Sequence, residues 1–165
     1  MRMRPPLQAF ALVLAVACGT AHGATGEPKK PEAKQAERGK YMVLVGGCND
    51  CHTDGFAPMD GKVAEKDWLL GSALGFRGPW GTTYAANLRI VIASMSEDAW
   101  VKYAHGLKTR PPMPWFSLNV WTEADLRAAY RYIRSLGAVG TPAPPFVPPG
   151  VEPKPPYLLW PSPPK

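Results

Sequence analysis

The sequence predicts a small all-α domain in which a few helices are joined by long loops, followed by a proline-rich C-terminal tail. Three observations support this fold class. Helix-start and helix-stop signals bracket several short segments, and no segment is rich in strand-forming residues. In addition, 16 glycines and 20 prolines punctuate the 165-residue chain. A chain of this length has room for one ordinary domain with appendages.

The first 24 residues have the features of an export signal. Arg2 and Arg4 form a basic start, residues 7–17 form a short apolar core, and small residues follow up to Ala24. We therefore expect a cleaved signal peptide over residues 1–24 and a periplasmic location. No other stretch reaches the roughly 20 apolar residues that a membrane-spanning helix needs, so we expect no transmembrane segment in the mature chain.

Charge and cysteine content limit the class of protein. Loss of the signal, which contains two arginines and no acid, reduces the net charge from +6 to +4. The basic residues are scattered, so we expect no nucleic-acid binding. A mild positive charge suits docking to acidic protein surfaces, and an ordinary solvated surface is the alternative. Cys18 lies in the signal, at a poor lipoprotein cleavage site. Only Cys48 and Cys51 remain in the mature chain, which excludes a disulfide framework.

The first half of the chain predicts one helix and one long irregular stretch. Residues 25–32 are polar and proline-punctuated, and we expect a flexible leader there. Residues 33–45 can be helical, with apolar residues gathered toward the end and Gly46 following as a breaker. Residues 53–94 are rich in glycine and lack a sustained period, which predicts a long loop region with one helical turn near residues 64–70. Such a stretch is implausible in a small domain unless something else organises it, and a cofactor would do so.

Two further helices are predicted in the second half. Ser96 is a suitable N-cap for a short helix that ends at Gly106. The last helix has the clearest signals, because Thr122 caps it, Asp125 occupies the capping-box position and Gly137 ends it. Four apolar residues of this last segment fall on one face: Leu126, Ala129, Ile133 and Leu136.

The folded domain is thus predicted over residues 33–140, and residues 141–165 form the tail. Eleven prolines in the tail exclude a helix or a central strand and favour an extended, polyproline II-like chain. The tail also contains more apolar residues than a linker requires. Two alternatives are therefore equal: the tail docks on the domain or on a partner, or it is disordered. These apolar residues are Phe146, Val147, Tyr157, Leu158, Leu159 and Trp160.

The strongest chemical signal is Cys48-Asn49-Asp50-Cys51-His52. Two thiols at this spacing can each form a thioether with a haem vinyl group, and the adjacent imidazole reaches the iron. We therefore predict one haem c, attached through Cys48 and Cys51 and ligated by His52. A thioredoxin-like redox pair is an alternative that needs a strand-to-helix junction, and none is visible. A structural zinc site would need further ligands, for which the mature chain offers only His105.

Met113 is the predicted second axial ligand. It lies in a rigid proline-rich loop, and a thioether favours ferrous iron and raises the reduction potential. The competing ligand, His105, lies at the end of a predicted helix, where the helix dipole also favours an imidazole; we interpret it as capping or solvated. An iron held by both His52 and Met113 predicts an electron carrier that is not itself an enzyme. The alternative is a haem enzyme or gas-binding protein with an open sixth position.

Several segments resemble class I c-type cytochromes. The likeness covers residues 35–137 and is closest to the haem domains in cytochrome subunits of bacterial periplasmic dehydrogenases, such as membrane-bound alcohol dehydrogenase. It therefore implies redox partner proteins, including a periplasmic dehydrogenase. The segments that carry the likeness, besides the haem motif, are Ala36–Tyr41, Gly81–Leu88, Pro112–Trp115 and Asp125–Leu136.

The resemblance implies a cytochrome c-like helical domain around the haem. In that fold the first and last helices would cross near Gly39 and Tyr132, and His52 and Met113 would clamp the haem. The resemblance also implies four further cofactor-binding residues. Tyr84 and Asn87 would lie in a loop beside the haem, and Arg110 or Trp115 would lie near a propionate.

Overall fold

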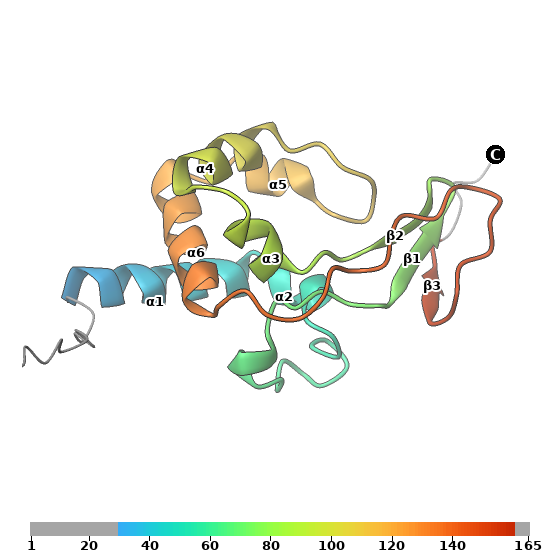
Figure 1. The fold of residues 1–165 in the computed structure, drawn as a ribbon, viewed down its shortest axis with the longest axis horizontal. Helices are drawn as coiled ribbons and strands as arrows, with labels where there is room; N and C mark the ends of the chain where they lie inside the picture. The colour runs from blue at the N-terminus through green and yellow to red at the C-terminus, as the bar shows by residue number, and fades with distance from the viewer. Residues whose placement is uncertain (1–29, 161–165) are drawn as a thin grey trace, which may run out of the picture.

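The computed structural model describes residues 30–160 (Figure 1). The predicted signal peptide with Cys18, most of the predicted leader and residues 161–165 of the tail lie outside these residues. The helices are α1 (Lys30–Val45), α2 (Cys48–His52), the 3-10 helix η1 (Glu65–Asp67), α3 (Leu88–Ala93), α4 (Glu97–Gly106), α5 (Trp115–Asn119) and α6 (Glu123–Ser135). The strands are β1 (Gly75–Gly78), β2 (Gly81–Tyr84) and β3 (Tyr157–Leu159).

The expectation of an all-α fold is wrong, because a three-stranded mixed sheet in the order β2-β1-β3 lies beside the helices (Figure 1). β1 and β2 form an antiparallel hairpin, and β3 of the tail pairs parallel to β1. The strands are only three or four residues long, and β1 and β2 contain glycine at their ends, so the sequence shows no alternating pattern that would have predicted them. β3 is an edge strand, which is the position in a sheet that a proline-rich segment can occupy.

Three helices, α1, α4 and α6, form what we call the helical frame. α1 and α6 cross each other (Figure 1), and Gly39 lies against Ala128 and Tyr132 at this crossing, as the resemblance implied. A Cβ atom added at Gly39 would lie 2.6 Å from Cβ of Tyr132 and still closer to the carbonyl oxygen of Ala128. Only glycine permits this close approach of the two backbones.

The predicted caps of the frame are confirmed. The Ser96 hydroxyl accepts a hydrogen bond from the amide of Ala99 at 3.2 Å, and the Thr122 hydroxyl accepts one from the amide of Asp125 at the same distance. α1 begins at Lys30, three residues before the predicted start. The buried core lies between these helices and the loop before β1. Its members are Val43, Trp68, Leu69, Ile92, Trp100, Val101, Ala104, Leu126, Tyr132 and Ile133.

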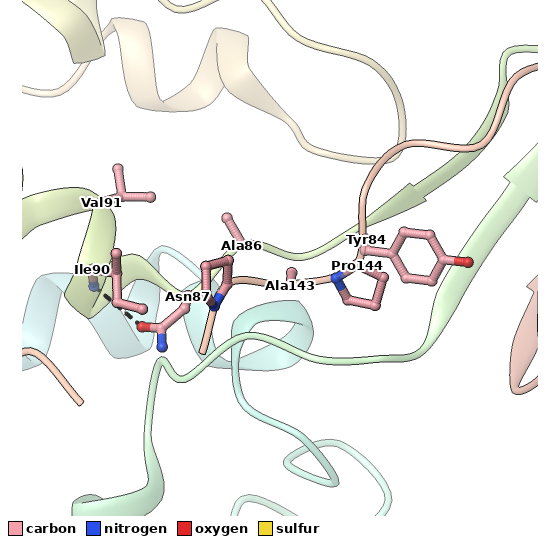
Figure 2. A pocket seen from close by; sticks show the side chains of 8 residues that line it. Tyr84, Ala86, Asn87, Ile90, Val91, Ala143 and Pro144 are labelled. Atoms are coloured by element: carbon pink, nitrogen blue, oxygen red, sulfur yellow. Dashed lines mark hydrogen bonds between the residues drawn. The ribbon is translucent and has the colours of Figure 1, made fainter. Parts of the chain in front are cut away.

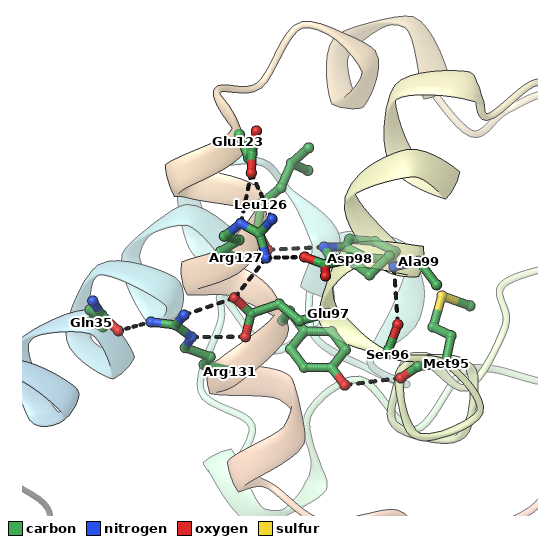
Figure 3. Close-up of polar contacts among 12 residues, drawn as sticks. Gln35, Met95, Ser96, Glu97, Asp98, Ala99, Glu123, Leu126, Arg127 and Arg131 are labelled. Atoms are coloured by element: carbon green, nitrogen blue, oxygen red, sulfur yellow. Dashed lines mark hydrogen bonds and ion pairs between the residues drawn. The ribbon is translucent and has the colours of Figure 1, made fainter.

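An ion-pair cluster ties α4 to α6 on the outside of the frame (Figure 3). Glu97 near the start of α4 accepts hydrogen bonds from Arg131 at 2.8 and 2.9 Å and from Arg127 at 3.2 Å. Arg131 also donates to Gln35 of α1, and Arg127 pairs with Glu123. The cluster therefore connects all three helices of the frame.

Residues 53–94 are more ordered than predicted. They contain both strands of the hairpin, the helix α3 and the single turn η1, which is the only one of these elements that the sequence indicated. Arg89 of α3 organises this stretch. It is 3% exposed, and its guanidinium donates to the carbonyl oxygens of Glu65, Lys66, Trp68 and Leu136 at 2.8 to 3.1 Å. An arginine thus orders much of a stretch that was expected to depend on a cofactor.

The tail docks on the domain at several points within residues 141–160. It leaves the end of α6, passes α3 and reaches the sheet (Figure 1). Asn87 donates to the carbonyl oxygen of Thr141 at 3.3 Å, Val147 forms a β-bridge with Thr82, and β3 completes the sheet. Of the two alternatives for the tail, docking on the domain is therefore observed for these residues. None of the helices within residues 30–160 combines the length and apolar character needed to cross a bilayer.

Candidate functional site

The Cys48–His52 segment forms the short helix α2, which follows α1 after a sharp turn. Gly47 adopts a left-handed conformation with φ of 65°, a geometry that suits glycine. Buried polar contacts then fix α2 to the body of the domain. The Thr53 hydroxyl donates to the Asn49 side chain at 2.7 Å and accepts from the amide of Leu69 at 2.7 Å. The two cysteines and His52 are therefore held on an anchored turn of helix.

His52 has a defined hydrogen-bond arrangement. Its Nδ1 atom lies 2.7 Å from the carbonyl oxygen of Ala86. Because a carbonyl can only accept, Nδ1 must carry the proton, which leaves the lone pair on Nε2. Burial lowers the pKa of His52, although the Ala86 bond opposes this shift. A neutral, oriented imidazole of this kind is how proteins present histidine to a metal ion.

The two cysteines are free thiols in the described structure. Burial raises the pKa of the Cys48 thiol to about 12 and also raises the pKa of Cys51, and the Asp50 carboxylate adds to both shifts. Reactive redox cysteines instead have lowered pKa values, so this environment argues against thioredoxin-like chemistry.

The zinc alternative also finds no support. Within residues 30–160, no group of three or more His, Cys, Asp and Glu side chains is placed to hold a metal ion. His105, the residue that a zinc site would have needed, donates through Nδ1 to the carbonyl oxygen of Asn119 at 2.9 Å. That carbonyl can only accept, so His105 caps α5 from the last turn of α4.

Beside α2 lies a cavity of about 540 Å³, which we call the central cavity. Cys48, Cys51 and His52 line it together with Met113, which comes from the loop between α4 and α5. His105 is not among the residues that line it. The remaining walls are mostly apolar and come from the helical frame, α3, β2 and the tail. This size lies within the range of protein sites for organic ligands, about 300 to 1,000 Å³.

The structure brings six of the eight predicted site residues to the central cavity: Cys48, Cys51, His52, Tyr84, Arg110 and Met113. Asn87 does not line it. Asn87 instead caps α3, where its side chain accepts hydrogen bonds from the amides of Arg89 and Ile90 at 3.1 and 3.3 Å. It also lines a smaller pocket of about 230 Å³ beneath the tail (Figure 2).

Trp115 also lies outside the central cavity. It begins α5, packs edge-on against Phe116 at a ring-centroid distance of 5.7 Å, and lies 6.0 Å from the Lys108 ammonium group. The structure therefore gives Trp115 a packing role in the described residues.

Sequence reasoning missed several residues that line the central cavity. Trp100 and Tyr103 come from α4, Trp121 precedes α6 and packs against Gly46, and Phe146 comes from the tail. Trp100 and Tyr103 could have been predicted as lining residues, because they lie on α4 next to core residues. Phe146 could not, because only the pairing of the tail with β2 brings it to the cavity.

The central cavity fits a haem in three respects. It is large and mainly apolar, two thiols sit side by side at one wall, and a soft thioether shares it with an imidazole whose Nε2 is available. These are the attachment and axial-ligand groups of a c-type haem. The residues present therefore fit that group.

Comparison with known proteins gives one similarity. The chain is 27% identical over 159 aligned positions to the fructose dehydrogenase cytochrome subunit of Gluconobacter japonicus, a match that covers 87% of this chain and 31% of that subunit. The chain thus spans about a third of the length of this relative. No protein-family model matches the sequence, and no solved structure matches it.

Proposed function

We propose that this chain is a c-type cytochrome that transfers single electrons as a carrier or as an electron-transfer subunit of a dehydrogenase. One haem would be attached through Cys48 and Cys51, with His52 and Met113 as axial ligands. The observation that carries the proposal is the central cavity, because it collects these four side chains from two separate segments. The similarity to a dehydrogenase cytochrome subunit supports the same role.

The proposed attachment needs no leaving group. Each thioether forms when a cysteine S–H adds across a vinyl double bond of the haem, so all atoms are retained. Cys48 and Cys51 both line the central cavity and are not joined to each other, as this addition requires.

The bound haem would supply the one-electron chemistry, and the protein residues control its surroundings. The Ala86 carbonyl fixes the ring of His52 so that Nε2 faces away from this hydrogen bond. Apolar side chains, including Trp100 and Ile133, line the cavity and would limit the contact of a bound haem with water. As an axial ligand of a bound haem, the thioether of Met113 would favour the reduced state and so raise the reduction potential. No residue is needed as a catalytic acid or base.

The proposed partner is a dehydrogenase that delivers electrons, and the proposed location is the periplasm. The similarity to a dehydrogenase cytochrome subunit supports the choice of partner. The basic and apolar composition of residues 1–24 supports export.

Met113 ligation separates an electron carrier from a gas-binding haem protein. In the protein produced with a haem-attachment system, we expect a low-spin spectrum with a ferric sulfur-to-iron charge-transfer band and slow binding of carbon monoxide to the ferrous form. Met113→Ala should lose the band and bind carbon monoxide readily. Met59→Ala, at a half-exposed methionine away from the cavity, is the matched control and should behave as the unmodified chain. Rapid carbon monoxide binding by the unmodified chain would contradict the carrier function and favour an open sixth position.

A further inference from the structure

Strand β2 holds the tail against the domain at one edge of the central cavity. The Thr82 amide donates to the carbonyl oxygen of Val147 at 2.8 Å, and the Val147 amide donates back to Thr82 at 3.0 Å. A Cβ atom added at Gly81 would lie 2.9 Å from the ring of Phe146 and still closer to the carbonyl oxygen of Val147. The absence of a side chain at Gly81 therefore permits this docking.

The same strand holds the loop that contains Arg110. The Thr83 hydroxyl donates to the carbonyl oxygen of Pro111 at 2.7 Å, which fixes the backbone next to Arg110. As a result the Arg110 guanidinium lies over the ring of Phe146, with Cζ 3.8 Å from the ring centroid. This is a close cation–π contact between the loop and the tail.

Arg110 has a positive charge at the cavity and no neutralising partner within the described part of the chain. Among residues 30–160 no carboxylate forms an ion pair with Arg110. Arg110 and Phe146 both line the central cavity, and so does Pro144 of the tail. A guanidinium that is fixed by an aromatic ring and faces a largely apolar cavity is well suited to bind a carboxylate of a ligand in that cavity.

We propose that residues 144–147 of the tail are a wall of the haem site, in which Phe146 positions Arg110 to pair with a carboxylate of the bound haem. This inference rests on the proposed function. It assigns the tail a part in the redox site, whereas the likeness to class I cytochromes ends at residue 137. Phe146 is a positioning residue here, because it acts through Arg110.

The expected consequence is a change in reduction potential. A positive charge beside the haem disfavours the ferric form, which has one more positive charge than the ferrous form. Loss of that charge should therefore lower the potential. In Arg110→Gln we expect the ferric-to-ferrous ratio at a fixed ambient potential to rise about fivefold, the size expected for one partly screened unit charge.

Spectroelectrochemical titration of the purified haem protein, without any partner protein, tests the assignment. Phe146→Leu should lower the potential in the same direction as Arg110→Gln, and the double variant should be no lower than Arg110→Gln alone, because both act through one contact. Phe146→Tyr keeps the ring and should restore the unmodified potential. Lys154→Gln removes an exposed positive charge from the tail away from the cavity and is the charge-matched control.

The outcomes separate this inference from the proposed function. A coloured protein whose potential is the same in Arg110→Gln and Lys154→Gln would overturn the inference and leave the proposed function intact. Equal, additive effects of the Arg110 and Phe146 substitutions would also overturn it, because they would act independently. An unmodified chain without bound haem would overturn the proposed function, and this inference with it.

Discussion

The helical frame and the sheet with its docked tail are stabilised in different ways. The frame buries a continuous set of side chains between α1, α4 and α6, with the two longest helices in contact at Gly39. The sheet has strands of three or four residues, and on its edge strand Leu158 and Leu159 are 50% and 74% exposed. Backbone pairing and a few side-chain contacts hold it in place. We therefore expect the frame to set global stability and the tail to open locally.

The central cavity takes walls from both regions. Cys48 and His52 come from the helix that follows α1, whereas Phe146 belongs to the tail. One part of the site should thus be as stable as the fold, and another part should respond to local changes. The following predictions test that division, beginning with the largest expected effect.

Gly39→Ala should disrupt the frame. The added methyl group would collide with the carbonyl of Ala128 and with Cβ of Tyr132, neither of which can move without shifting α6. We expect the free energy of unfolding to fall by roughly 3 kcal/mol or more, as measured by denaturant titration. Gly106→Ala is the control, because an added Cβ there meets nothing within 4 Å. If the two variants were equally stable, the close helix crossing would not be important for the fold.

Gly81→Ala should loosen the tail and leave the frame intact. The new side chain would meet Val147 and Phe146, and Gly81 has φ of 100°, which disfavours alanine. We expect the free energy that holds the tail on β2 to fall by about 1 to 3 kcal/mol. Hydrogen exchange at the amides of Thr82 and Val147 should accelerate, while exchange in α6 stays unchanged.

Gly150→Ala is the matched control for this experiment. Gly150 also lies in the tail and has φ of 82°, but an added Cβ would meet no atom within 4 Å. It shares the backbone strain and lacks the collision. If hydrogen exchange in Gly81→Ala accelerated as much in α6 as at Val147, the tail and the frame would unfold together. That result would contradict local opening of the tail.

A smaller, pH-dependent effect is expected from the ion-pair cluster on the frame. Hydrogen bonds from Arg131, and then from Arg127, lower the pKa of Glu97 below its usual value of 4.5, although burial opposes them. A lowered folded-state pKa means that the contribution to stability is present above about pH 4.5 and is lost as pH falls through the folded-state pKa. Because the cluster is partly solvated, we expect it to contribute about 1 kcal/mol or less to the free energy of unfolding.

Glu97→Gln should remove this acid-sensitive part of the stability, as seen by comparing denaturation midpoints at pH 7 and pH 3. Glu37→Gln is the control, because Glu37 is exposed on α1 and forms no ion pair among the described residues. An equal loss of acid sensitivity in both variants would argue that the effect comes from overall charge and not from the cluster.

The sequence was most informative where structure is local. Capping residues and apolar periodicity predicted α4 and α6 within a residue or two, and Gly46 predicted the end of α1. These signals depend on neighbours three or four positions apart, so they can be read without a structure. The Cys48–His52 motif is local in the same sense, and its residues do lie together at the cavity.

The sheet and the docking of the tail depend on contacts between distant segments. The sequence did not predict the sheet, and for the tail it left docking and disorder as equal alternatives. β3 pairs with β1 across about eighty residues, in a segment whose prolines suggest no regular structure. Asn87 was assigned to the cofactor from its likeness to a family segment, and the structure uses it to cap α3 and to hold Val139.

The most direct test of the central claim is the intact mass of the purified chain after production with a haem-attachment system and extraction with acidified solvent. We predict a mass increased by one haem, which remains after extraction. Cys48→Ser/Cys51→Ser should have only the polypeptide mass, while other cavity residues such as Tyr84 stay in place. An unmodified chain that has the polypeptide mass alone, with two titratable thiols, would contradict the claim.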